Sequence, residues 1–104
     1  MNIGCVIYTK NFTTGEIAAK WSFDDGKNIM EGTGIAIGIK SNDYVGNYKI
    51  TYYDNDKNNI GEFDLIIKKE NNSYKLKWYK DQILKFTGIA LLVNSLLTGG
   101  WKPV

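Results

Sequence analysis

The sequence contains no histidine, no arginine and a single cysteine, and each of these shortages excludes a class of function. Without histidine, catalysis by a nucleophile and a base lacks its usual proton acceptor. One cysteine, Cys5, is too few for a zinc site or an intrachain disulfide. Cys5 lies in an apolar run, so we expect a buried small hydrophobic residue and no reactive thiol. The composition therefore predicts a protein that is not an enzyme and holds neither a metal nor a cofactor.

The absence of arginine also bears on the partners of the protein. All 13 basic residues are lysine, against 11 acidic residues, which gives a formal net charge of +2. Arginine supplies the planar fork that grips phosphates and guanine edges, and nucleic-acid readers concentrate their charge in a stripe. The lysines here are spread from Lys10 to Lys102. We therefore predict no nucleic-acid partner.

Long apolar runs are missing as well. No stretch approaches the roughly 20 consecutive apolar residues that a membrane-spanning helix needs. The first residues carry neither a basic segment nor a long apolar segment, so no signal peptide is predicted. We expect no membrane partner and a cytoplasmic location, unless a leader has been removed from the chain.

Alternation of apolar and polar residues, the pattern of β-strands, runs through most of the sequence. Residues 48–52 and 74–78 both follow it, and each segment leaves one face for a core and one for water. Runs of Asn, Asp and Gly separate the segments and favour turns. Residues 89–97 are the only segment in which a short helix competes. The predicted strands lie near residues 3–9, 16–23, 30–39, 46–53, 61–69, 73–80, 84–93 and 96–101.

The two halves of the chain share landmarks in the same order. Lys20-Trp21 recurs as Lys77-Trp78. Thr33 to Ala36 recurs as Thr87 to Ala90, and Gly46 matches Gly100. We interpret residues 2–53 and 60–104 as two similar four-stranded units. Neither unit could bury its apolar face alone, so we expect a single domain over residues 1–104.

Eight short antiparallel strands can close into a barrel or stack as two sheets. Every second residue from Gly32 to Gly38 is glycine or alanine, which leaves one face of a strand almost without side chains. A bare face permits the strong coiling that closes a small barrel, and closure removes exposed edge strands. We therefore predict an all-β fold, an eight-stranded antiparallel up-and-down barrel, with a two-sheet β-sandwich as the alternative.

An eight-stranded meander with a glycine-rich strand and tryptophans such as Trp21 and Trp78 resembles the lipocalin and avidin-like β-barrels and small bacterial β-barrel domains. The resemblance covers the whole chain and rests on architecture. It implies a barrel that holds one small ligand, and it assigns no residue to the binding of that ligand.

The bare glycine face has two interpretations, which remain open at this point. An aromatic ring covers it, or it lines a cavity. The interior of an eight-stranded barrel is either just filled by side chains or able to hold one small ligand. We predict that the protein binds a small apolar or aromatic ligand in the interior or mouth of the barrel. The candidate lining residues are Trp21, Phe23, Gly34, Ala36, Tyr74 and Trp78.

Two other functions are compatible with the sequence. Tyr52 and Tyr53 are adjacent in a strand, so one of them must point outward, and Tyr79 and Trp101 are further candidates for exposed aromatic residues. Exposed aromatic side chains anchor protein interfaces, which predicts an interaction or regulatory module that works as a homodimer. The same side chains would also suit a carbohydrate-binding surface.

Overall fold

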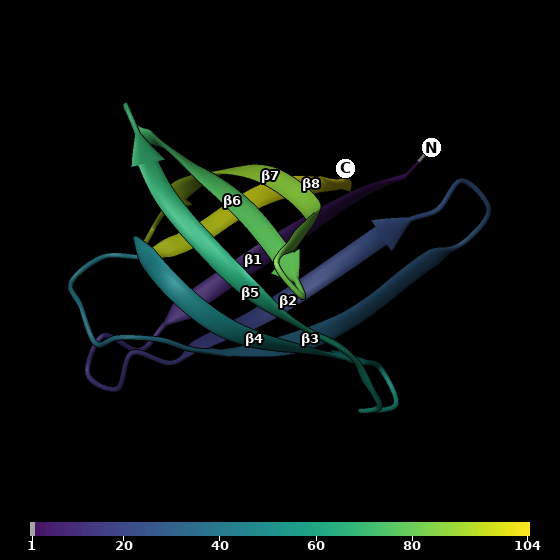
Figure 1. Ribbon diagram of the computed structural model, residues 1–104, viewed down its shortest axis with the longest axis horizontal. Helices are drawn as coiled ribbons and strands as arrows, with labels where there is room; N and C mark the ends of the chain where they lie inside the picture. The colour runs from purple at the N-terminus through teal and green to yellow at the C-terminus, as the bar shows by residue number, and fades with distance from the viewer. Residues whose placement is uncertain (1) are drawn as a thin grey trace.

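The computed structural model describes residues 2–104, which form a closed antiparallel barrel of eight β-strands (Figure 1). Each strand pairs with the next one along the chain, and β8 pairs with β1 to close the sheet. The predicted up-and-down barrel is confirmed, and the alternative two-sheet sandwich is not formed. The strands are β1 (Ile3–Lys10), β2 (Ile17–Asp24), β3 (Ile29–Ile37), β4 (Gly46–Asp54), β5 (Asn59–Glu70), β6 (Ser73–Lys80), β7 (Ile83–Val93) and β8 (Leu96–Pro103).

Residues 89–97, for which a short helix was the alternative to a strand, belong to a β-hairpin. Strand β7 continues to Val93, and β8 starts at Leu96. Between them, Asn94 and Ser95 have φ angles of 49° and 71°. Positive φ at both central residues is the type I′ geometry, which matches the right-handed twist of the flanking strands. Over residues 2–104, no helix has the length and apolar character needed to cross a membrane.

Alternation along each strand separates an inner face from an outer face. On β1, Val6 and Tyr8 are buried in the interior, and Ile7 between them is exposed. Cys5 belongs to the outer set and is exposed, so its prediction as a buried residue is wrong. The alternation is hard to see around Cys5 because the outer positions of β1 are themselves apolar.

Two glycines of β3, Gly32 and Gly34, lie beneath aromatic rings. A Cβ atom built on Gly32 would lie 2.6 Å from the indole of Trp21, and one on Gly34 would lie 2.8 Å from the ring of Tyr52. Both distances are shorter than any ordinary carbon contact. The bare face therefore accommodates aromatic side chains of the neighbouring strands, which is the first of the two interpretations of the glycine pattern.

The shared landmarks of the two halves coincide only in part. The matching strand pairings are Lys20 with Thr33 and Lys77 with Thr87. The Lys-Trp and Thr-Gly-Ile-Ala segments therefore face each other in the same register in both halves. Gly46 begins β4, whereas Gly100 lies in the middle of β8, so the third landmark is not equivalent. The division into two repeated units stays a prediction.

Candidate functional site

The two ends of the barrel are built differently. At one end, the segment between β3 and β4 turns inward, and Tyr44 in that segment is buried. The other end is where β1 begins and β8 ends (Figure 1). A cavity opens there among aromatic side chains. The barrel therefore has a plugged end and an open end.

Tyrosine side chains plug the closed end. The Tyr44 hydroxyl donates to the carbonyl oxygen of Ser95 at 2.7 Å and accepts from the backbone N–H of Lys10 at 3.1 Å. Tyr48 donates its hydroxyl hydrogen to the carbonyl oxygen of Tyr44 at 2.7 Å. Burial raises the pKa of Tyr44, and it raises the pKa of Tyr48 to about 12. Both hydroxyls are therefore neutral donors at physiological pH.

Lys10 carries a buried charge at the closed end, with only 5% of its surface exposed. Its ammonium group donates to the carbonyl oxygen of Asp43 at 2.7 Å, and to Ser41 Oγ and the Tyr48 hydroxyl at 2.9 Å each. A fourth acceptor, the carbonyl oxygen of Ile39, lies at 3.5 Å, so the three nearer acceptors match the three hydrogens of the ammonium group. Burial lowers the pKa of Lys10, while the nearby carboxylate of Asp43 acts in the opposite direction. Lys10 thus ties the β3–β4 segment to the barrel wall.

Lys10 was not among the predicted residues, although the sequence carries a signal for it. Lys10 follows Val6 and Tyr8 at two-residue spacing, which places it on the inner face of β1. A lysine at an inner position demands acceptors, because an unpaired buried charge is costly. Two of those acceptors, on Ser41 and Asp43, come from a loop that lies 31 and 33 residues later in the chain. Their position could not be read from a local pattern.

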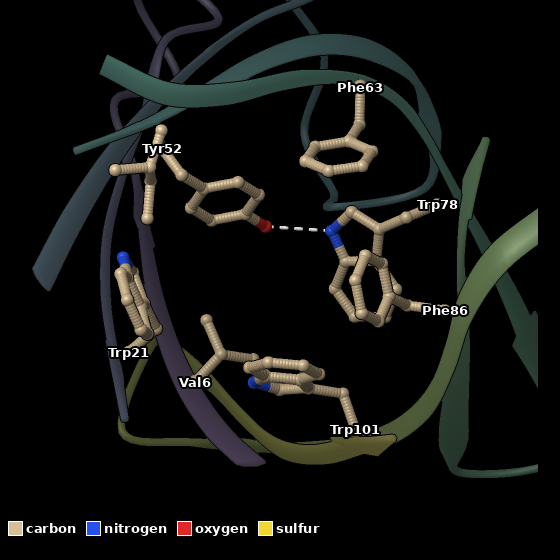
Figure 2. Close-up of a pocket in the computed structure, with 8 residues that line it drawn as sticks. Val6, Trp21, Tyr52, Phe63, Trp78, Phe86 and Trp101 are labelled. Carbon is tan, nitrogen blue, oxygen red and sulfur yellow. Dashed lines mark hydrogen bonds between the residues drawn. The ribbon is translucent and has the colours of Figure 1, made fainter. Parts of the chain in front are cut away.

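The open end holds a cavity of about 160 Å³. All three tryptophans of the chain belong to its wall. Figure 2 shows the side chains standing around a central space. The cavity is lined by Val6, Trp21, Tyr52, Ile60, Phe63, Trp78, Phe86 and Trp101.

Contacts between rings hold the cavity wall in place. The indole of Trp101 stacks on Phe23 with centroids 4.8 Å apart, and Phe86 meets the same indole edge-on at 5.3 Å. Phe63 meets Phe86 edge-on at 5.6 Å. Stacked and edge-on pairs of this kind are the favourable aromatic geometries. Each ring is braced by a neighbour, so the rings do not collapse into the space between them.

Two β-bulges shape the open end. The register between β4 and β5 shifts after Tyr52 and leaves Ile60 as the extra residue, and the register between β6 and β7 shifts after Trp78. A bulge changes the direction of a side chain relative to regular alternation. Ile60 is half-exposed and contributes to the mouth of the cavity. The bulges therefore occur beside the two residues, Tyr52 and Trp78, that a hydrogen bond joins across the cavity wall.

The polar atoms of the tryptophans in the wall all have partners. The indole N–H of Trp21 donates to the carbonyl oxygen of Thr33 at 2.9 Å, and that of Trp101 donates to the carbonyl oxygen of Cys5 at 3.2 Å. The indole N–H of Trp78 donates to the Tyr52 hydroxyl at 2.7 Å (Figure 2). The indoles therefore present only apolar surface to the cavity.

The structure brings two of the six residues predicted to line a ligand site, Trp21 and Trp78, into this cavity. Phe23 stacks against Trp101, which does line the cavity. Gly34 lies beneath the ring of Tyr52, and Ala36 is buried in the core. Tyr74 lies at the closed end, where its hydroxyl donates to Asp43 Oδ1 at 3.0 Å.

Several residues of the cavity wall were not among the predicted ones. Tyr52 faces the interior, and Tyr53 after it is therefore the outward member of the pair. Trp101 lines the cavity, so its prediction as an exterior aromatic residue is wrong. Phe63 could have been found from the alternation of Phe63, Leu65 and Ile67, which shares the inner face of β5.

Nothing in the described part of the chain resembles a metal centre, since no three His, Cys, Asp or Glu side chains of residues 2–104 come together. Comparisons with known protein families, curated proteins and solved structures found no match to this chain. Any function is therefore proposed from the geometry of the barrel.

Proposed function

We propose that the barrel binds one small apolar or aromatic molecule in the cavity at its open end and performs no chemistry on it. The observation that carries the proposal is a preformed space of about 160 Å³ whose wall is aromatic and aliphatic. Concave, mostly apolar sites with few polar groups are typical of small-molecule binding. A closed barrel of eight strands is also of the size that can hold one small ligand in its interior.

The size of the cavity limits the ligand to about one ring. An engineered apolar cavity of roughly 150 Å³ in another protein binds benzene, which gives the scale. A monocyclic aromatic molecule of about six to nine non-hydrogen atoms fits this class of space. Small ligands gain at most about 1.5 kcal/mol per non-hydrogen atom. Six atoms at that ceiling give about 9 kcal/mol, slightly tighter than a micromolar dissociation constant. A cavity that is open at its mouth should bind less tightly than the ceiling, so we expect dissociation constants between micromolar and millimolar.

The three indole N–H groups make the proposal testable. All three tryptophans line the cavity, so the three indole cross-peaks of a ¹H–¹⁵N NMR spectrum report on its wall. Toluene is expected to shift all three peaks in a saturable manner. Val6→Phe should weaken this binding more than tenfold, because the larger ring fills the space.

Ile7→Phe is the matched control, since Ile7 is the next residue on β1 and points outward. This variant should bind toluene like the native protein. If saturating toluene leaves the indole peaks of the native protein unchanged, the cavity is not a ligand site and the proposal fails.

A second candidate function is association through the outer face of β7, β8 and β1. Cross-strand pairing joins residues of these strands into two rows without a charged side chain. The rows are Cys5, Gly100 and Ile89, and Ile7, Thr98 and Leu91. Ile7, Ile89 and Leu91 are exposed. Contiguous apolar patches on an outer surface are typical of protein interfaces, and a homodimer with a two-fold axis would cover the patch with its own copy.

Sedimentation equilibrium tests this second candidate. The native protein should sediment as a dimer, and Leu91→Lys should make it monomeric because a lysine would be buried without a partner. Thr51→Lys, which adds the same charge to the outer face of β4, should leave the dimer intact. A native protein that is monomeric at all concentrations would contradict the proposal. The carbohydrate-binding alternative has no comparable support, because Trp101 faces the cavity.

A further inference from the structure

Three polar side chains form a hydrogen-bonded chain beside the cavity. The indole N–H of Trp78 donates to the hydroxyl of Tyr52 at 2.7 Å, and that hydroxyl lies 2.8 Å from the hydroxyl of Tyr8. The three groups carry three donor hydrogens, but only two contacts join them, and each contact uses one hydrogen. Within residues 2–104, neither hydroxyl makes a further hydrogen bond.

One hydroxyl hydrogen is therefore left without an acceptor among residues 2–104. The hydrogen of Trp78 is used by the oxygen of Tyr52. Of the two hydroxyls, only one can donate to the other, so the remaining hydroxyl hydrogen needs an acceptor from elsewhere. A buried donor that finds none is costly.

The position of the two hydroxyls decides which of them can meet an outside acceptor. Tyr8 is completely buried and does not line the cavity, whereas Tyr52 is part of the cavity wall. When Tyr8 donates to Tyr52, the hydrogen of Tyr52 is free for a molecule in the cavity. Burial raises the pKa of both phenols, well above the usual value for Tyr8, so both keep their hydrogens at physiological pH.

Among the wall residues that the structure describes, only Tyr52 can offer such a contact. The indole hydrogens of Trp21 and Trp101 are used by backbone carbonyl oxygens. The other wall residues are Val6, Ile60, Phe63, Trp78 and Phe86, of which only Trp78 has a polar atom, and its hydrogen is bound to Tyr52. The cavity thus combines an apolar wall with one donor at a fixed place.

We propose that the cavity selects a small aromatic molecule that bears one neutral hydrogen-bond acceptor, such as a carbonyl, ether or nitrile, and that Tyr52 donates to this acceptor. The inference rests on the proposed function and adds the chemical class of its ligand. A carboxylate is disfavoured, because none of the wall residues is a cation and a buried unpaired charge is costly.

A pair of ligands with nearly the same shape tests the proposal. Benzonitrile carries an acceptor at the end of a linear substituent, and phenylacetylene replaces it with a C–H group. Titrations followed by the three indole peaks should give about three- to tenfold tighter binding for benzonitrile, the effect of one neutral hydrogen bond. The nitrile stretching frequency of the bound molecule should be that of a hydrogen-bonded nitrile.

Two variants that each remove one hydroxyl should behave oppositely. Tyr52→Phe should abolish the preference for benzonitrile and bring the nitrile frequency to its value in an apolar solvent. Tyr8→Phe should keep the preference for benzonitrile and the hydrogen-bonded nitrile frequency, because Tyr52 retains its hydrogen and then has no acceptor among residues 2–104. Tyr8→Phe is therefore the matched control for the loss of a buried hydroxyl.

The possible outcomes separate the two proposals. Equal affinities for the two ligands in the native protein, or a preference that survives in Tyr52→Phe, would overturn the acceptor inference and leave the ligand site in place. If neither molecule shifts the indole peaks, the proposed function fails as well. Should Tyr52→Phe not fold, the nitrile frequency in the native protein decides the question.

Discussion

At the scale of single residues, the interior is organised by pairs of one glycine and one aromatic ring. Gly4 lies beneath the indole of Trp101, so closely that a methyl group on Gly4 would overlap the ring. Trp101 is held from its other sides by Phe23 and Phe86. The absence of a side chain at Gly4 therefore determines where this part of the cavity wall stands.

The Gly4–Trp101 pair leads to a stability prediction. Gly4→Ala should lower the free energy of unfolding by about 1–3 kcal/mol, the usual effect of overpacking a braced core. It should also shift the indole N–H peak of Trp101, since the ring must move. Urea denaturation and NMR measure the two effects.

Gly100→Ala provides the control for this substitution. A Cβ atom on Gly100 would have its nearest neighbour, the carbonyl oxygen of Gly4, at 3.5 Å, which is ordinary contact. We expect its free energy of unfolding to stay within about 0.5 kcal/mol of the native value. If Gly4→Ala and Gly100→Ala lower the free energy of unfolding equally, the close contact between Gly4 and Trp101 is not the cause of the loss.

At the scale of elements, local pattern located the strands but not their irregularities. The segment predicted at 16–23 is the strand Ile17–Asp24, because alternation and turn residues act over a few neighbours. Strand β3 was predicted to reach residue 39 and ends at Ile37. From there the chain turns inward and buries Tyr44 within a polar segment, which no periodicity announces.

The two bulges were equally hidden from the sequence. Ile60 is out of phase with the inner positions Phe63, Leu65 and Ile67, but a single apolar residue near the start of a strand is also ordinary on an outer face, and only its pairing partners reveal that it is an extra residue. A bulge is a property of two strands together. Its contribution to the mouth of the cavity therefore became visible only when β4 and β5 were paired.

At the scale of the whole molecule, the buried phenols make stability depend on pH. Burial raises the pKa of five tyrosines, to about 12 for Tyr48, while an unfolded tyrosine ionises near pH 10. A group whose pKa is higher in the folded state contributes stability that is complete below the unfolded pKa and is lost as the pH rises through the folded pKa. Burial lowers the pKa of Lys10, so the contribution of this one group to stability rises with pH, opposite to that of the five tyrosines.

We therefore expect the free energy of unfolding to change little up to about pH 9 and to fall steeply above about pH 10. Urea denaturation at a series of pH values measures the fall, and tyrosinate absorbance shows when the phenols ionise. Most of the seven tyrosines should ionise only as the barrel unfolds. Ionisation of all seven near pH 10 in a barrel that stays folded would contradict this prediction.

By itself, the sequence determined the number of strands, their approximate limits and the antiparallel order of neighbouring strands, because alternation and turn chemistry are local properties. Only the tertiary structure paired β8 with β1 and so formed a closed barrel instead of a two-sheet sandwich. Only the tertiary structure decided that Tyr44 and Lys10 plug one end and that a cavity remains at the other. A cavity is the difference between the volume that eight strands enclose and the volume that their inner side chains fill. That difference depends on register, bulges and ring orientation around the whole barrel at once, so no single segment of the sequence contains it.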